Sequence, residues 1–297
     1  MVLLHGLGGS IDSHYMPRGA LAAAAAGMSS LRLNLRGADL SGEDFYHAGL
    51  TADVHAALAS PALRRYRRIY LLGHSLGGHL ALRFASEPGD PRVAAVAAIC
   101  SPLDLRRSQQ AIDAPGGWPY RRYLLSHLAR IYATVAARRR LPLPAAYVAR
   151  LRKMRDFDDW VVAPRHGFDG AEDYYARASV APRLGRLRVP ALLVNSTVDP
   201  MVLARAVRPA LDRRVSRLEV RWVPEGGHVG FPPGVDLGLA PDRAGGGPGS
   251  AAGVDDAGRA GADHRAKSGN AAPAAVAPRV VDQVLAWLRR APGSVPE

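Results

Sequence analysis

Six short apolar runs recur along the chain and alternate with segments of helical spacing. Each run is followed by turn residues, which predicts β-strands near 2–5, 30–35, 68–73, 92–100, 190–195 and 217–223. Helices are expected between them, near 17–27, 50–60, 76–86, 202–212 and 279–290. This alternation predicts a single α/β domain over residues 1–297. Its sheet should be mostly parallel, with helices on both faces and catalytic groups at the carboxyl edge.

Two stretches interrupt this alternation. Residues 105–180 are too long for a connection and too helical for a linker, so we expect a helical cap that shapes a pocket. Its two helices should run from Trp118 to Arg140 and from Ala145 to Arg155. Residues 232–277 are rich in Gly, Ala, Pro and Asp and contain no aromatic residue. Such a composition cannot offset the entropy of ordering, and a disordered insertion is expected there.

The run that ends at Leu72 leads directly into Gly73-His74-Ser75-Leu76-Gly77. This G-x-S-x-G order is typical of a nucleophile elbow, in which a strand turns sharply into a helix and presents a serine hydroxyl. Glycines at 73 and 77 suit it, because a turn this tight leaves no room for Cβ atoms. The alternative is a glycine-rich loop around an inert serine, which the same pattern would match.

A serine hydroxyl needs a histidine to remove its proton and a carboxylate to orient that histidine. Asp199 follows the strand at 190–195, and His228 follows the strand at 217–223 on a Gly-Gly loop. The order Ser75, Asp199, His228 is the order found in α/β-hydrolases. Asp104 is the alternative acid, since it comes directly after the strand at 92–100.

An oxyanion hole is the remaining requirement of such a site. The amide of Leu76, next to the serine, should be one donor. The amide of Leu7, in the glycine-rich loop His5-Gly-Leu-Gly-Gly9, should be the other. That loop could instead cradle a phosphate, but neither G-K-[ST] nor GxGxxG spacing is present.

With these motifs the chain resembles the YheT-like α/β-hydrolases. The resemblance implies a serine hydrolase acting on fatty-acyl esters, by hydrolysis or by acyl transfer to an alcohol, with Ser75, Asp199 and His228 as its triad. One departure is Val198, since family members usually have a second acid there. The segments that carry the resemblance are 5–9 with Tyr15, 33–37 with 45–49, 73–80, 168–169 with 174–179, and 226–230.

Met1 lies almost inside the first expected strand, so the first sheet strands of the family are not in this sequence. Coding sequence upstream of Met1 that supplies two or more strands is therefore expected. His47, in the segment 45–49, is interpreted as a structural loop residue, with a place in the site as the alternative.

The net charge of +13 raises the question of nucleic-acid binding. All but two of the 39 basic residues are arginine, and they are spread among abundant Ala, Gly and Pro. This distribution favours a compositional bias over a phosphate-binding face, so no nucleic acid is expected. Weak peripheral contact with an anionic membrane stays open, because a lipid-like ester is the expected substrate.

The remaining residue types indicate neither a metal nor a cofactor. Neither HExxH nor paired cysteines occur, and Cys100 is expected to be a buried residue rather than a nucleophile. A single cysteine and the lack of a signal-peptide pattern favour a cytoplasmic protein.

Together these features predict a carboxylic ester hydrolase that works through an acyl-serine intermediate. Acyl transfer to an alcohol is the alternative within enzymes. A catalytically silent binding or interaction protein is the alternative from another class. The sequence does not indicate an oligomeric state.

Overall fold

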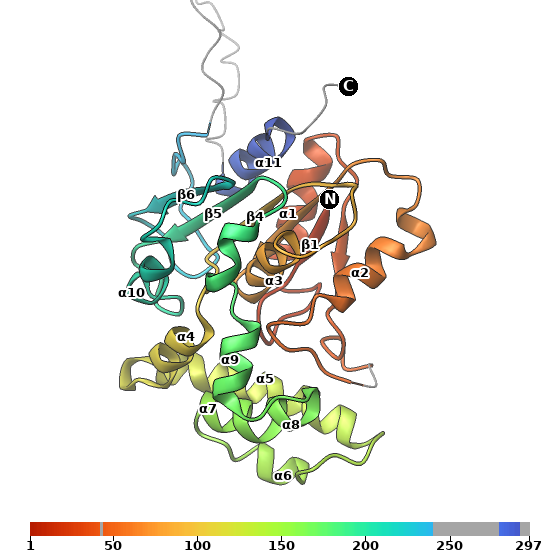
Figure 1. Cartoon of the computed structure of the whole chain (residues 1–297), viewed down its shortest axis with the longest axis vertical. Coiled ribbons are helices and arrows are strands. Elements are labelled where there is room, and N and C mark those ends of the chain that lie inside the picture. The colour runs from red at the N-terminus through yellow and green to blue at the C-terminus, as the bar shows by residue number, and fades with distance from the viewer. Residues whose placement is uncertain (42–43, 240–278, 292–297) are drawn as a thin grey trace, which may run out of the picture.

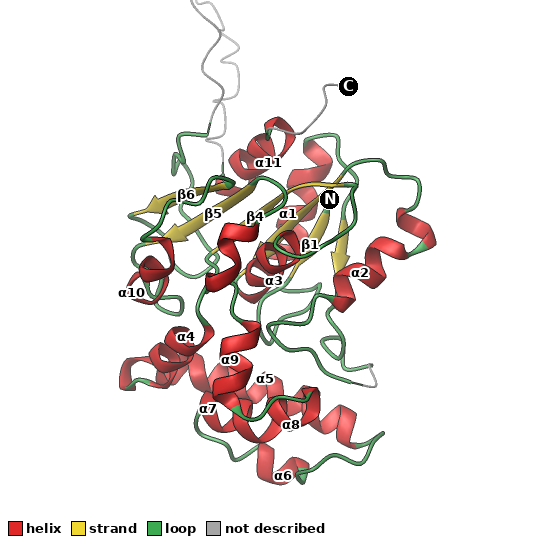
Figure 2. Ribbon diagram, viewed as in Figure 1, coloured by secondary structure: helices red, strands yellow, loops and turns green. Residues whose placement is uncertain are grey.

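The computed structural model describes residues 1–41, 44–239 and 279–291. Six parallel strands form one sheet there, in the order β2-β1-β3-β4-β5-β6 (Figure 2). Each predicted apolar run forms one of them, within two residues of its expected bounds. The strands are β1 (Val2–Leu4), β2 (Leu31–Leu33), β3 (Ile69–His74), β4 (Val93–Ile99), β5 (Ala191–Ser196) and β6 (Leu218–Val223).

Strand β1 is an interior strand. It pairs with β2 on one side and with β3 on the other, and its three side chains are buried. In the described part of the sheet, β2 and β6 are the outermost strands. The loop that follows β1 therefore begins from a position fixed on both sides.

Helices cover both faces of the sheet, as the alternation of side chains along a strand requires. Leu3, Leu72 and Val194 face α1 (Tyr15–Ala25) and α11 (Val280–Arg290). The alternate side chains pack with α2 (Ala52–Ala59), α3 (Leu76–Ala85) and α10 (Ala204–Val207). Helix α10 is shorter than predicted, because it passes into a 3₁₀ turn that contains Pro209, which has no N–H to donate.

Between β4 and β5 the chain forms a helical insertion that Figure 1 shows as a separate group below the sheet. The expected helix from Trp118 is present as α5. The expected single helix from Ala145 to Arg155 is wrong, because this stretch is divided between α6 and α7. The insertion contains α4 (Leu105–Asp113), α5 (Trp118–Ala136), α6 (Ala145–Val148), α7 (Met154–Phe157), α8 (Ala163–His166) and α9 (Ala171–Ala178).

A contact across the insertion explains where α7 begins. Asp113, at the end of α4, accepts hydrogen bonds from the amides of Met154 and Arg155 at 2.9 and 3.1 Å. It supplies the acceptor that the first turn of a helix lacks. The start of α7 is therefore stabilised by a residue about forty positions earlier in the sequence.

The stretch predicted to be disordered, 232–277, is ordered at its start. Leu237 and Leu239 are buried, and the side chain of Gln283 on α11 bonds the Leu237 amide at 2.8 Å and the Val235 carbonyl at 2.6 Å. These apolar residues find a surface to bury against, which composition alone could not show. Residues 240–277 of this prediction lie outside the described residues.

Candidate active site

Ser75 occupies the sharp turn between β3 and α3. Its φ is +52° and its ψ is −119°, a conformation that residues with a side chain rarely adopt and that costs on the order of 1–3 kcal/mol. The Ser75 amide donates to the Ile99 carbonyl at 2.8 Å, and the Ser75 carbonyl accepts from the His79 amide at 3.1 Å. The surrounding strands and helix therefore hold this strained backbone in place.

Both glycines of the motif are required by space. A Cβ at Gly73 would lie 2.1 Å from the Gly77 carbonyl oxygen, and one at Gly77 would lie 2.3 Å from the Leu4 carbonyl oxygen. These obstacles are backbone atoms, which cannot turn aside as a side chain could. The geometry is thus that of a nucleophile elbow.

Asp199 and His228 are brought together at the ends of two neighbouring strands, β5 and β6. Asp199 Oδ2 lies 2.9 Å from His228 Nδ1, and Asp199 is only 2% exposed. The other carboxylate oxygen accepts from the amides of Met201 and Val202 at 2.8 and 2.9 Å. Both oxygens of this buried carboxylate are therefore hydrogen-bonded, which fixes the partner of the imidazole.

Asp104, the alternative acid, has a different place. It is the N-cap of α4 and accepts a hydrogen bond from the Arg107 amide at 3.0 Å. Its other oxygen lies 3.5 Å from the Arg107 guanidinium. The structure therefore pairs His228 with Asp199 and gives Asp104 a capping role in the insertion.

The two amides expected to bind an oxyanion border the same cavity as Ser75. Leu76 is the first residue of α3, where a helix has no carbonyl to accept from the amide. Across the described residues, no hydrogen bond occupies the amide of Leu76 or that of Leu7. Both donors are therefore available to a ligand.

Three aromatic side chains hold the loop that carries Leu7. Tyr15 accepts from the Gly6 amide at 2.9 Å, and Tyr46 accepts from the Gly8 amide at 2.7 Å. His5 Nε2 accepts from the Leu35 amide at 3.1 Å, so Nδ1 carries the proton and donates to the Gly6 carbonyl at 2.8 Å. Burial lowers the pKa of His5 to about 4, and the ring stays neutral in this role. Both His5 and Tyr46 lie in the motifs noted in the sequence, but no role was predicted for either, because the amides they bond, of Leu35 and Gly8, are distant along the chain.

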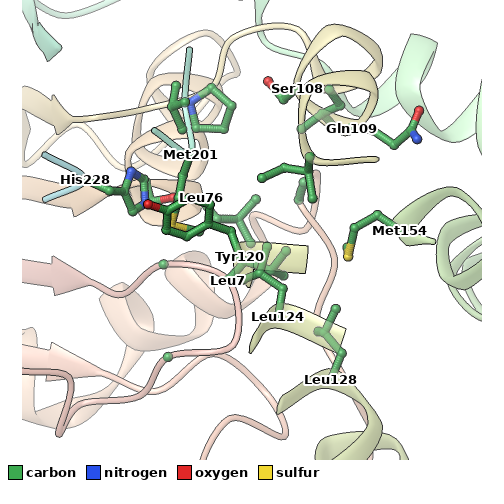
Figure 3. Close-up of a pocket in the computed structure, with 18 of the residues that line it drawn as sticks. Leu7, Leu76, Ser108, Gln109, Tyr120, Leu124, Leu128, Met154, Met201 and His228 are labelled. Carbon is green, nitrogen blue, oxygen red and sulfur yellow. The ribbon is translucent and has the colours of Figure 1, made fainter. Parts of the chain in front are cut away.

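The cavity has a volume of about 580 Å³ and extends from Ser75 and His228 to the helical insertion. Figure 3 shows His228 on one side, Met154 on the opposite side, and Leu7 and Leu76 between them. Its apolar lining comes from the sheet edge and from the insertion, and includes Leu7, Leu76, Leu105, Ile112, Leu124, Leu128, Met154, Val162, Met201, Val202 and Val229. An elongated apolar group fits such a lining.

His47 also borders this cavity. Its Nδ1 accepts from the Gly49 amide at 3.1 Å, and its ring lies 4.5 Å from that of His166. Burial lowers the pKa of His47 to about 3, with the charges of His166 and Arg83 acting in the same direction. His47 is therefore both a structural loop residue, through its bond to Gly49, and a neutral ring on the cavity lining.

Cys100 lies beside the acid and the histidine, and its Sγ, a carboxylate oxygen of Asp199 and a ring nitrogen of His228 fall within 4.8 Å of one another. Such a cluster could ligate a metal only with a deprotonated thiol. Burial, with the charge of Asp199, raises the pKa of the Cys100 thiol to about 12. The carboxylate and His228 Nδ1 are also already bonded to each other. These groups fit proton transfer better than metal binding.

A family model described as the alpha/beta hydrolase fold matches residues 1–235. The chain belongs to the α/β-hydrolase family. This hydrolase is 33% identical over 247 residues to "Putative esterase YheT" of Escherichia coli (strain K12), and the match covers 78% of this chain and 70% of YheT. The YheT-like assignment made from the sequence motifs is confirmed by this similarity.

More distant matches include a relative named as a lipase and a solved α/β hydrolase. A monoacylglycerol lipase of Saccharomyces cerevisiae is 25% identical over 216 residues, which covers 68% of this hydrolase and 48% of the lipase. The solved α/β hydrolase GrgF of Penicillium sp. sh18 is 17% identical, with a TM-score of 0.50 and coverage of 76% and 81% of the two chains. That structural likeness shows the fold alone.

Within the described ranges, no helix combines the length and the apolar character needed to cross a membrane.

Proposed function

We propose that this chain is a carboxylic ester hydrolase that cleaves fatty-acyl esters through an acyl-serine intermediate. The observation that carries the proposal is the meeting of the Ser75 elbow and the Asp199–His228 pair at one apolar cavity. Relatives named as an esterase and a lipase support the class of reaction. The apolar lining supports an acyl group as the part of the substrate that is bound.

The hydrogen bond between His228 and Asp199 supports one arrangement of the protons. His228 Nδ1 donates to Asp199, which leaves Nε2 as the acceptor for the Ser75 hydroxyl proton. The serine oxygen then attacks the ester carbonyl carbon, and the oxyanion that forms accepts from the amides of Leu7 and Leu76. His228 returns the proton to the departing alcohol, which leaves the acyl group on Ser75. A water molecule, deprotonated by His228, then attacks the acyl-serine and releases the free acid.

Hydrolysis of a short p-nitrophenyl ester tests this function. Ser75→Ala and His228→Ala should each lower kcat by several orders of magnitude and by similar amounts, because members of a triad act as a unit. Equal hydrolysis by the wild-type protein and by Ser75→Ala would contradict the proposal and would favour a binding or interaction protein instead.

Acyl transfer to an alcohol is a second candidate. A relative of Saccharomyces cerevisiae, 27% identical over 233 residues, is named medium-chain fatty acid ethyl ester synthase/esterase 2, and this chain covers 51% of it. The same acyl-serine would serve both reactions, with an alcohol in place of water. Product analysis after addition of ethanol separates them, since transfer yields an ethyl ester and hydrolysis yields only the free acid.

A further inference from the structure

One carboxyl group in the cavity has no part in the proposed reaction. Asp158 lies in the insertion, where α7 passes into a π-helical turn, Asp158–Val162, and it borders the cavity while being only 8% exposed. Across the described residues it forms no ion pair. A buried carboxyl without a cation is unfavourable unless hydrogen bonds satisfy it.

Its observed partner satisfies only half of it. The hydroxyl of Tyr175, on α9, donates to Asp158 Oδ2 at 2.7 Å. In the described part of the chain, Asp158 Oδ1 accepts no hydrogen bond. A purely structural pairing would account for the first oxygen and would leave the second without a role. Oδ1 is therefore left for a water or a ligand in the cavity that Asp158 borders.

Asp158 and Tyr175 belong to the insertion, whereas Ser75 and His228 follow strands of the sheet, and all four border one cavity. Met154, one helical turn before Asp158, is on the side of the cavity opposite His228 (Figure 3). Asp158 and Tyr175 come from different segments of the insertion, and their hydrogen bond joins those segments. A substrate that bound at Ser75 and filled the cavity as far as the insertion would therefore meet this pair.

The chemistry of the pair selects among ligand groups. Burial raises the pKa of Asp158 to about 7, although the Tyr175 hydrogen bond and the charge of Arg155 act in the opposite direction, so both protonation states are accessible. A hydroxyl suits both, because it donates to the carboxylate and accepts from the carboxylic acid. The carboxylate would repel an anion, and an alkyl chain would leave Oδ1 without a hydrogen-bond partner. An ammonium group would lose its hydrating water on entering a cavity lined mainly by apolar side chains.

We propose that Asp158, held by Tyr175, forms a polar subsite that binds an uncharged hydroxyl group of the ester substrate. This inference rests on the proposed function for the identity of the ester, and it adds a residue that selects among esters. The hydroxyl can belong to the acyl chain or to the alcohol, and the experiment separates these two sources.

Binding to the Ser75→Ala form of the full chain tests the subsite without any dependence on turnover. Butyl octanoate is the reference ester. One series places a single hydroxyl on successive carbons of the butyl group, and a second series places it on successive carbons of the octanoyl chain. Calorimetry then gives the affinity of each ester relative to butyl octanoate.

At least one hydroxylated ester should bind about tenfold or more tightly than the reference, and its series identifies the side of the ester that faces Asp158. Asp158→Leu in the same background should remove this preference. Asp158→Asn, which keeps polar atoms in the same volume, should retain much of it. Asp159→Asn is the matched control, because Asp159 bonds the Ala171 amide and the asparagine keeps that acceptor.

Two results would overturn the subsite. One is that no hydroxylated ester binds more tightly than butyl octanoate. The other is a preference that persists in Asp158→Leu, or that Asp159→Asn removes equally. The binding experiment uses Ser75→Ala, which does not depend on turnover. A failure of the proposed function would instead be seen in the hydrolysis assay of the wild-type protein, so the two failures are distinguishable.

Discussion

Asp199 holds His228 through one carboxylate oxygen, at 2.9 Å from Nδ1, while its other oxygen is held by the amides of Met201 and Val202. The carboxylate is therefore fixed by the backbone at the end of β5, and the ring at the end of β6 takes its orientation from it. This hydrogen bond joins the loop after β5 to the loop after β6 and positions His228, the proposed base.

Asp199→Asn should lower kcat/KM for a p-nitrophenyl ester by roughly 10³-fold or more, because the histidine loses the acceptor that fixes its tautomer. Asp104→Asn should stay within a few-fold of the wild-type value, since Asp104 caps a helix of the insertion. Steady-state kinetics on the two variants gives the comparison. A larger loss in Asp104→Asn would show that the acid has been misassigned.

Tyr46→Phe should lower kcat by about tenfold with a smaller change in KM. The substitution leaves the Gly8 amide without its acceptor and loosens the loop that carries Leu7, a donor needed mainly in the transition state. Tyr132→Phe is the matched control, because the Tyr132 hydroxyl bonds Leu143 within the insertion. Equal effects of the two substitutions on kcat would contradict a role for the loop.

The strands and the proposed catalytic residues could be expected from sequence because their signals are local. The elbow is five consecutive residues, and each strand is a short apolar run with turn residues after it. The helices of the insertion were harder to predict, because they depend on contacts between segments that are distant along the chain. Asp113 on α4 bonds the first turn of α7, and Tyr175 on α9 bonds Asp158. A residue whose role depends on a distant backbone amide, such as Tyr46, gives no pattern along the chain.

Gln283→Ala should lower the free energy of unfolding by about 1–3 kcal/mol. It removes two hydrogen bonds, and leaves the buried Leu237 amide and the partly buried Val235 carbonyl without this partner. The exposed Gln110→Ala is the control and should change stability by a few tenths of a kcal/mol at most. Urea denaturation measures both, and equal midpoints would show that this segment does not contribute to the fold.

Stability should fall between pH 7 and pH 5.5. Burial lowers the pKa of His5 to about 4, and those of His47 and His74 to about 3, so the unfolded chain binds more protons as the pH drops below 6.5. Each of these three histidines then lowers the free energy of unfolding by about 1 kcal/mol as the pH falls from 7 to 5.5. Asp158 acts in the opposite direction, because its raised pKa of about 7 lets the folded state take up a proton in this range.

The net fall in unfolding free energy over that interval should be about 2 kcal/mol or more, since burial also lowers the pKa of His79 and of His166. Asp158→Asn should make it steeper, since the opposing group is removed. Urea midpoints at the two pH values measure the change in both proteins. A midpoint that rises on acidification would contradict the burial of neutral histidines in the folded state.

Covalent labelling with a fluorophosphonate tests most directly whether Ser75 is a nucleophile activated by His228. The wild-type protein should gain one label, located on the peptide that contains Ser75 by mass spectrometry. Ser75→Ala should gain none, and His228→Ala should react far more slowly because its serine keeps its proton. A wild-type protein that stays unlabelled, or a label that persists in Ser75→Ala, would contradict the account.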